Sequence, residues 1–333
     1  MSTAAPIVVM GAGAVGGFVG GRLAAAGNEV HFVGRAATFE AWRRRGLRLT
    51  DLEHAERHLL DNALHLHAEP PPLAGALGLL TVKCGATREA ARQLAAALPP
   101  GTPVLSLQNG VRNVDEAAQA APGLVWIPGV VAFNVAELAP GHLHRGTSGG
   151  IAAAAHPALA PWLPRLAAAG LPVQTHADLQ PVQWGKLLLN LNNPVNALAG
   201  LPLRAQLLDR DCRRVTAALQ AEALGALAAA GIRPASLTPL APHWIVRVLR
   251  LPTPLFRIVA ARMLRIDASA RSSMADDLAR GRATEIDAIC GAVVRLAHAH
   301  GRDAPLNRRM VEWLDTAEPA RRSGKMLRQA LGI

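Results

Sequence analysis

The sequence contains no tyrosine, and only three of its 35 basic residues are lysine: Lys83, Lys186 and Lys325. The absence of tyrosine excludes every mechanism in which a tyrosine serves as the acid. Arginine keeps its proton near neutral pH, whereas a buried lysine can release one. A lysine in a chain that otherwise uses arginine is therefore a candidate for a role that needs a transferable proton.

Cysteine is also scarce. Cys84, Cys212 and Cys290 are scattered along the chain. This distribution excludes a disulfide scaffold, fits a reducing cytoplasm and gives no metal-ligand spacing, so we expect no metal site. Charged residues make up only 18% of the 333 residues and hydrophobic residues 50%. Disorder of the whole chain is therefore excluded, and the length predicts two domains, each with its own core.

The net charge of +11 raises the question of a nucleic-acid partner. Aromatic residues make up only 3% and the arginines are spread along the chain, so we expect no specific nucleic acid and a phosphate-bearing small ligand instead. Signals for a leader or a membrane span are missing too. The mostly apolar stretch Ile7–Gly27 lacks the basic segment that begins a signal peptide, and Leu251–Ile266 is broken by prolines and arginines. We expect a soluble, cytoplasmic protein with no membrane partner.

The first half alternates short apolar runs with alanine-rich helical stretches, which favours a parallel sheet covered by helices. The expected strands are Ile7–Met10, Glu29–Val33, Leu47–Thr50, Leu77–Val82, Val104–Leu107 and Leu124–Pro128. The expected helices are Val15–Ala26, Thr87–Leu98 and Asn113–Ala120. Further strands are expected across Gly129–Ala155, with a turn at Pro140-Gly141.

From about Gln180 onward nearly every segment has a helical period. The expected helices are Pro181–Leu198, Asp209–Ala230, Leu255–Ile266, Ser273–Ala279, Glu285–His300 and Leu306–Thr316. The domain boundary is expected near Gln174–Leu179, which gives domains 1–176 and 177–333. The predicted fold class is α/β, an N-terminal Rossmann-like doubly wound sheet followed by an all-α C-terminal domain.

The first expected strand runs into Gly11-Ala12-Gly13-Ala14-Val15-Gly16, the pattern G-x-G-x-x-G between a strand and a helix. The first glycine permits a tight turn, the second lets the backbone approach a pyrophosphate, and the third lets the helix pack on the strand. The helix N-terminus adds free N–H groups and a positive dipole end. We predict that residues 11–16 bind a dinucleotide; the alternative is a glycine-rich packing turn.

The second expected strand ends in Gly34-Arg35, where an NAD site would carry an acidic residue. Arg35 can hold a 2′-phosphate through forked, charge-assisted hydrogen bonds, which favours NADPH over NADH. The alternative is an ordinary loop arginine. Arg43, Arg44 and Arg45 are interpreted as a solvated turn rather than as a second phosphate site.

Two later strands are followed by polar residues, Lys83 after Val82 and Asn109-Gly110 after Gln108. Ligands of an open parallel sheet lie beyond the C-terminal ends of its strands. Lys83 and Asn109 are therefore candidates for contact with the nicotinamide or the substrate, although Asn-Gly is also a common turn pair.

In the second half, Lys186, Asn190 and Asn193 stand at i, i+4 and i+7 on one face of an otherwise apolar helix. Such groups are costly to bury unless they line a polar cleft; the alternative is an exposed polar stripe. Ser273 and Glu285 are candidates for the same site or are simply residues at helix starts. Both can reach one site only if the helix between them breaks, and Gly281 is the candidate break.

Together these residues resemble the ketopantoate reductase (2-dehydropantoate 2-reductase) family over nearly the whole chain. The resemblance rests on the glycine loop, Lys83, Asn109-Gly110, Trp184-x-Lys186-x-x-x-Asn190, Ser272-Ser273-Met274, Thr284-Glu285-Ile286-Asp287 and His300-Gly301 with Ala304-Pro305-x-Asn307. It implies NADPH-dependent reduction of the 2-oxo group of ketopantoate to pantoate, on the route to pantothenate and coenzyme A.

The same likeness implies roles for the candidate residues. Gly11–Gly16 and Arg35 would hold the phosphates of the cofactor, with Lys83 and Asn109 near the nicotinamide ribose and the reacting carbon. Lys186 would be the general acid, Asn190 and Ser273 would bind substrate oxygens, and Glu285 would lie beside the nicotinamide ribose and Lys186. An ammonium can stabilise the alkoxide that develops during hydride transfer and then supply the proton.

The chain departs from the family pattern at Ala270, where an asparagine is expected. The second amide of the lysine helix is Asn193 or Asn196, and the segment Thr238–Ile266 is longer than in compact members. The alternatives are a reductase of the same fold that acts on another 2-oxo acid or carbonyl, and a non-catalytic NADPH-binding sensor. The sequence leaves open whether the chain forms a homodimer.

Overall fold

The computed structural model describes residues 5–261, 264, 270–316 and 319–333. The chain divides into two compact units, Met1–Leu179 and Gln180–Ile333. The first unit is built on a sheet covered by helices, and the described residues of the second unit are helical or irregular. The predicted fold class, α/β followed by an all-helical region, is confirmed.

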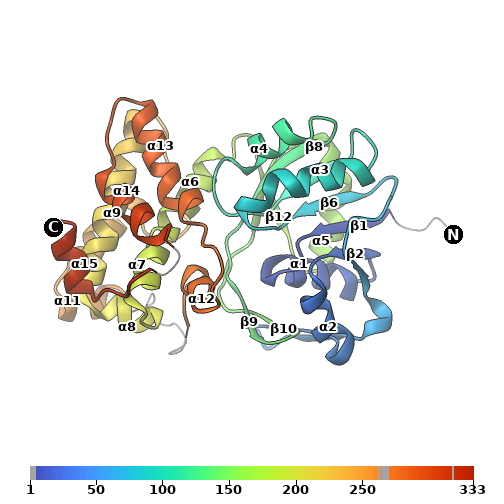
Figure 1. Cartoon of the computed structure of the whole chain (residues 1–333), viewed down its shortest axis with the longest axis horizontal. Coiled ribbons are helices and arrows are strands. Elements are labelled where there is room, and N and C mark those ends of the chain that lie inside the picture. Colours follow the sequence, from blue (N-terminus) through green and yellow to red (C-terminus); the bar gives the residue numbers. More distant parts are fainter. Residues whose placement is uncertain (1–4, 262–263, 265–269, 317–318) are drawn as a thin grey trace. The chain divides into compact units, whose positions relative to one another are not determined.

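An eight-stranded sheet forms the centre of the first unit (Figure 1). The spatial order β5-β2-β1-β6-β7-β8 is parallel throughout and is the order of the dinucleotide-binding fold. β11 continues the sheet antiparallel to β8, and β12 pairs in parallel with β11. The strands are β1 (Ile7–Met10), β2 (Val30–Val33), β5 (His65–His67), β6 (Leu77–Leu80), β7 (Pro103–Ser106), β8 (Val125–Val131), β11 (Ile151–Ala154) and β12 (Val173–His176).

Helices cover both faces of this sheet, because alternate side chains of each strand point to opposite sides. Ile7 and Val9 pack with α1 (Ala14–Ala25), α2 (Ala36–Arg45) and α5 (Leu163–Ala168) in one core. Val8 and Met10 pack with α3 (Thr87–Ala97) and α4 (Asn113–Ala120) in a second core. Figure 1 shows α3 and α4 on one side of the strands and α1 and α2 on the other.

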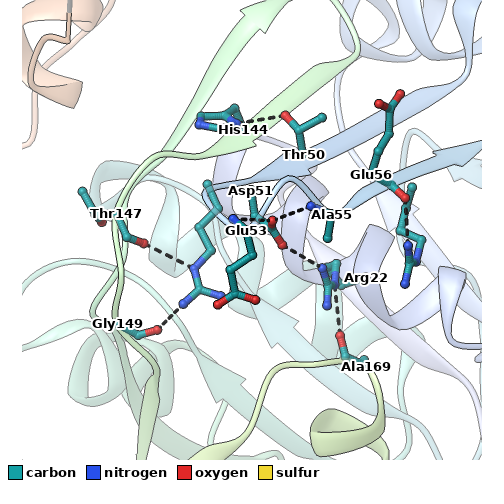
Figure 2. A network of polar contacts seen from close by, with 12 residues as sticks. Arg22, Thr50, Asp51, Glu53, Ala55, Glu56, His144, Thr147, Gly149 and Ala169 are labelled. Atoms are coloured by element: carbon teal, nitrogen blue, oxygen red, sulfur yellow. Dashed lines mark hydrogen bonds and ion pairs between the residues drawn. The ribbon is translucent and has the colours of Figure 1, made fainter. Parts of the chain in front are cut away.

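A second, four-stranded sheet in the order β4-β3-β10-β9 is attached to α1. The Asp51 carboxylate pairs with Arg22 of α1 at 3.3 Å and accepts the N–H groups of Glu53 and Ala55, while Arg22 also donates to the carbonyl of Ala169 (Figure 2). The strand predicted at residues 47–50 is present, but it belongs to this second sheet and not to the central parallel sheet. These strands are β3 (Leu47–Asp51), β4 (Glu56–Leu59), β9 (Val135–Ala139) and β10 (His142–Arg145).

The second unit is organised around its longest helix, α9 (Arg210–Ala229), against which α7, α8, α10, α13, α14 and α15 pack. A π-helical turn, Asp287–Gly291, leads into α13. The remaining helices are α6 (Gln180–Asn190), α7 (Asn192–Ala199), α8 (Leu203–Leu208), α10 (Pro242–Arg250), α11 (Thr253–Val259), α12 (Ser273–Ala279), α13 (Ala292–Ala299), α14 (Pro305–Leu314) and α15 (Gly324–Ala330).

Several predicted elements differ from the structure. The single helix expected over 181–198 is two helices, because Pro194 has no N–H for the carbonyl of Asn190 and its ring clashes with that carbonyl, so the first helix ends there. Arg43–Arg45 are exposed, as expected of a solvated turn, and form the last turn of α2. α11 ends at Val259, and residues 262–263 and 265–266 of the helix predicted there lie outside the described residues.

Over the part of the chain that the structure describes, none of the helices combines the length and the apolar character that a membrane crossing requires.

Candidate active site

The glycine loop joins β1 to α1 at the point where the strand order of the sheet reverses. Gly11 has φ +113°, and the N–H groups of Gly11 and Ala12 both donate to the carbonyl of Val33 at the end of β2. Gly13 precedes α1 in an extended conformation, and among the described residues no side chain caps the helix. The N-terminus of a 12-residue helix is thus left to bind an anion.

The three glycines of the loop have different surroundings. A Cβ at Gly11 would lie 2.6 Å from the backbone N of Val82, and a Cβ at Gly16 would collide with the carbonyl of Gly11 and the hydroxyl of Thr81. A Cβ at Gly13 would meet nothing within 4 Å. The packing of the chain explains why Gly11 and Gly16 have no side chain. Gly13 borders open space, which fits a pyrophosphate held by the backbone of residues 11–16.

Arg35 follows β2 and precedes the first turn of α2 with an extended backbone. Gly34, beside it, donates its N–H to the carbonyl of His67 at 3.0 Å, and a Cβ at Gly34 would lie 2.8 Å from the Cβ of Ala12. These contacts hold the Arg35 backbone close to the glycine loop. Its side chain is exposed and has no hydrogen-bond or ion-pair partner among the residues that the structure describes.

The structure brings Lys83 and Asn109 to the same edge of the sheet through contacts that sequence reasoning missed. The buried Gln108 amide donates to the carbonyl of Val82 at 2.9 Å and to the hydroxyl of Thr87 at 2.8 Å. The Cys84 thiol donates to the carbonyl of Asn109 at 3.0 Å. The segment after β7 is thus tied to the segment after β6. The position of the Gln108 amide just after an apolar strand could have marked it as a structural residue. The sequence alone does not show which groups it would bond.

Lys186 lies on α6 in the second unit, where Gly185, Leu187 and Leu188 around it are buried. Its own side chain is partly buried, and burial lowers the pKa of its ammonium from the ordinary 10.5 to about 8. Among the described residues it forms no ion pair that would hold the charge. A proton donor with a pKa near 8 gives up its proton far more readily than an ordinary lysine.

The asparagines near Lys186 have different surroundings. Asn190 is buried at the end of α6, and Asn193 is partly buried in α7. The expected single helical stripe is therefore interrupted at Leu191. Asn196 is fully buried: its amide donates to the carbonyl of Leu201 at 2.8 Å and to Gln206 at 2.9 Å, and its oxygen accepts the N–H of Ser272 at 2.9 Å.

These contacts bear on the choice between Asn193 and Asn196 that the sequence left open. Because the side-chain groups of Asn196 are hydrogen-bonded within the chain, Asn193 is the better candidate for ligand contact. Asn193 accepts a hydrogen bond from the Ser272 hydroxyl through its backbone carbonyl, at 3.4 Å, and its side-chain amide takes no part in that contact.

Ser272 and Ser273 also separate into two roles. Ser272 is the N-cap of α12, because its hydroxyl accepts the N–H of Ala275, whereas Ser273 is exposed in the first turn. The carbonyl of Ala270 accepts the N–H of Leu203, which ties this segment to α8. α12 ends at Ala279 and Gly281 has φ +60°, so the predicted break is confirmed.

Glu285 lies after that break, directly before the helical run that opens with the π turn. It is partly buried, and its carbonyl accepts the N–H of Ile289 at 3.2 Å. The described residues contain no cluster of three or more His, Cys, Asp or Glu that could hold a metal ion.

The comparison with protein families decides the assignment. The model described as Ketopantoate reductase PanE/ApbA matches residues 7–158, and the model described as Ketopantoate reductase PanE/ApbA C terminal matches residues 178–318. The chain belongs to the ketopantoate reductase family. The resemblance inferred from the motifs is thereby confirmed, and the chain is an oxidoreductase of this family.

Relatives of this ketopantoate reductase family member match over almost its full length. It is 26% identical over 314 residues to the 2-dehydropantoate 2-reductase of Archaeoglobus fulgidus, covering 92% of this chain and 95% of that one. It is 28% identical to a PanE/ApbA family ketopantoate reductase from Ralstonia eutropha JMP134, with a TM-score of 0.78 over 98% of this chain and 100% of that one.

A more distant neighbour shares the fold. The ternary structure of D-mandelate dehydrogenase with NADH and anilino(oxo)acetate is 19% identical, with a TM-score of 0.73 over 98% of this chain and 100% of that one. The family assignment indicates a nicotinamide dinucleotide as the cofactor.

Proposed function

We propose that this chain reduces ketopantoate to pantoate with NADPH, and that Lys186 donates the proton. The observation that carries the proposal is the state of Lys186, a partly buried lysine whose pKa is lowered to about 8 in a chain that uses arginine almost everywhere else. The family membership and the 2-dehydropantoate 2-reductases among the relatives support the substrate. Pantoate formation would serve the route to pantothenate and coenzyme A.

The residues of the first unit fit the proposed cofactor. The backbone of residues 11–16 would hold the pyrophosphate, and the open space beside Gly13 supports this. Arg35 would hold the 2′-phosphate, since it is exposed, close to the glycine loop, and stands where an NAD site would carry a carboxylate. Lys83 and Asn109 would contact the nicotinamide end. When bound, NADPH supplies the hydride.

The residues of the second unit supply the rest of the chemistry. As the carbonyl carbon gains the hydride, the carbonyl π electrons move to oxygen and negative charge develops there. The Lys186 ammonium stabilises that charge and transfers its proton from Nζ to the oxygen, leaving a neutral amine that is protonated again from water. Asn190, Asn193 and Ser273 would bind the other substrate oxygens, and Glu285 would orient the lysine and the nicotinamide ribose.

A second candidate function is the reduction of another 2-oxo acid by the same groups. Ala270 favours it, because the methyl group cannot supply the hydrogen bonds of the asparagine that the family pattern has there. An Ala270→Asn variant should raise kcat/KM for ketopantoate relative to other 2-oxo acids if the position reads the substrate. An unchanged preference would remove this role from Ala270.

The proposal is tested with purified protein, NADPH and ketopantoate, measured by loss of the absorbance of the reduced nicotinamide. Ketopantoate is expected to give the highest kcat/KM in a panel of 2-oxo acids. A higher value for another acid would favour the second candidate. Tight NADPH binding without turnover of any acid would contradict both and leave a non-catalytic sensor. Sedimentation of the same protein tests the homodimer, which stays a prediction.

A further inference from the structure

The helices α10 and α11 expose large apolar side chains. Trp244 is 48% exposed, Leu255 52%, Ile258 75% and Val259 56%. Both helices nevertheless bury another face, since Ile245, Val246, Val248, Leu249 and Phe256 belong to one core cluster. The exposed side chains are therefore an outer surface of two well-packed helices, and water is a poor environment for them.

The charge on this part of the chain has one sign. Between Glu222 and Asp267 the sequence has no acidic residue and six arginines. Arg247, Arg250 and Arg257 lie on α10 and α11 and are exposed. The Arg247 guanidinium lies 4.5 Å from the centre of the Trp244 ring, so aromatic and basic groups are directly adjacent.

A buried arginine fixes the bend between the two helices. Arg213 of α9 donates to the carbonyls of Leu249 and Leu251, at 3.2 and 2.9 Å, and to the hydroxyl of Thr253 at 3.2 Å. Its guanidinium also lies 4.2 Å from the centre of the Phe256 ring. The exposed side chains on both sides of the bend are thus presented by a rigid support.

We propose that the exposed side chains of α10 and α11 together form one surface that docks the protein on an anionic lipid bilayer. This surface consists of Trp244, Arg247, Arg250, Leu255, Arg257, Ile258 and Val259. Apolar side chains on an interfacial helix enter the boundary between headgroups and acyl chains, tryptophan prefers the same depth, and arginines pair with lipid phosphates. The proposal goes beyond the reductase activity, because none of these residues belongs to the candidate active site.

The charge of the surface argues for a lipid rather than for a second copy of this chain. In a two-fold dimer centred on this surface the same residues meet themselves, so the arginines of both copies would face one another, and residues 223–266 supply no carboxylate to separate them. An anionic bilayer supplies the complementary charge and the apolar environment together. The sequence-based expectation of no membrane partner rested on the lack of a long apolar run, which a peripheral contact does not need.

The test is sedimentation of the full chain with vesicles of phosphatidylcholine alone or mixed with phosphatidylglycerol. The protein is expected to sediment with the mixed vesicles, to remain in solution with phosphatidylcholine, and to be released by salt. The double variant Ile258→Glu, Val259→Glu is expected to bind mixed vesicles at least about tenfold more weakly. The control is Leu138→Glu on β9, where a leucine whose exposure (60%) lies between those of Val259 and Ile258 is outside the surface.

Charge is tested separately with Arg257→Glu, for which Arg43→Glu on α2 is the control. Thermal unfolding and NADPH binding report that each variant is folded. The proposal is overturned if the wild type does not sediment with mixed vesicles, or if the control variants lose as much vesicle binding as the surface variants do. A dimer that Ile258→Glu, Val259→Glu converts to a monomer, without vesicle binding in the wild type, would assign the surface to a second copy instead.

Discussion

The hydroxyl of Thr81, which follows β6, donates a hydrogen bond of 2.8 Å to the carbonyl of Gly11, which follows β1. The Thr81 N–H also donates to the carbonyl of Met10 at 2.9 Å. The first glycine of the glycine loop is therefore held by the neighbouring strand of the sheet, on the side where the strand order reverses.

This contact predicts the effect of removing the hydroxyl. Thr81→Val keeps the shape of the side chain but removes the hydroxyl from the Gly11 carbonyl, which then keeps only the N–H of Gly13 as a donor among these contacts. We expect the NADPH dissociation constant to rise about fivefold, which corresponds to one hydrogen bond of about 1 kcal/mol. Thr81→Ser should retain most of the affinity. Fluorescence titration with NADPH measures both, and equal affinity in Thr81→Val and the wild type would contradict the role of the hydroxyl.

The glycine loop offers a matched pair of variants. Gly13→Ala adds a methyl group that meets no atom of the chain, so the free energy of unfolding should fall by no more than about 1 kcal/mol. Its NADPH affinity should fall much more, because the methyl group would occupy the space proposed for the pyrophosphate. Gly11→Ala should destabilise the fold itself by about 2 kcal/mol or more, given φ +113° and the contact with Val82. Normal NADPH binding by Gly13→Ala would contradict this use of the loop.

Arg35 is predicted to decide between the two nicotinamide cofactors. Arg35→Ala should weaken NADPH binding at least about tenfold, the usual cost of one charge-assisted pair, and leave NADH binding nearly unchanged. Arg43→Ala is the control, since Arg43 is equally exposed but lies at the other end of α2. Isothermal titration with both cofactors gives the comparison. Parallel losses for NADPH and NADH would assign Arg35 a general structural role.

The buried amide of Asn196 supports the segment that carries Ser273. Asn196→Ala would remove the acceptor of the Ser272 N–H and the donor to the Leu201 carbonyl. It would also remove the donor to the Gln206 Oε1, although the Gln206 Nε2 would keep its hydrogen bond to Asn192. We expect a loss of about 2 to 4 kcal/mol in the free energy of unfolding, measured by urea denaturation. Asn193→Ala should cost little stability and instead raise the KM for the 2-oxo acid. A stability loss in Asn193→Ala together with a raised KM in Asn196→Ala would mean that Asn193 is the structural residue and Asn196 the residue that contacts the ligand.

Much of the first unit follows from local sequence signals. Strand β1, the glycine loop and α1 are adjacent in the chain, and the apolar run with three glycines is enough to predict them. The four-stranded sheet could not be predicted as such, because β3 pairs with β10 far along the chain and tertiary contacts choose that partner. The same limit applies to Gln108, whose partners Val82 and Thr87 belong to another segment.

In the second unit the helical period of the sequence predicts that helices form but does not predict where each one ends. Pro194 was visible in the sequence, and its effect on the carbonyl of Asn190 explains why one expected helix is two. The pKa of Lys186 could not be read from the sequence, because burial depends on what packs around α6. The exposure of Ile258 could not be read either, since its apolar neighbours predict a buried helix equally well.

Lys186 is proposed to donate the proton, and its lowered pKa predicts how activity and stability change with pH. Below pH 8 the lysine is protonated, so kcat/KM for reduction should be highest there and fall as the pH rises through about 8. Burial lowers the pKa from 10.5, so the folded state binds fewer protons than the unfolded state between about pH 8 and 10.5, and stability should rise with pH in that window. Below pH 8 the buried ammonium lowers stability by about 3 kcal/mol.

Replacing the lysine separates these two effects. Lys186→Met removes the charge but keeps the length of the side chain, so its melting temperature at pH 7 should be above that of the wild type. The variant should bind NADPH normally, since the glycine loop and Arg35 are unchanged. A lower melting temperature would mean that the ammonium is held by favourable contacts.

The most direct measurement is the pH profile of kcat/KM for the NADPH-dependent reduction of the best 2-oxo acid, in the wild type and in Lys186→Ala. The wild type is predicted to lose activity with an apparent pKa near 8. Lys186→Ala is predicted to keep its NADPH affinity, to lose about a hundredfold or more in kcat/KM, and to lose that pH dependence. A Lys186→Ala enzyme within a few fold of the wild type, with the same fall near pH 8, would show that another group donates the proton.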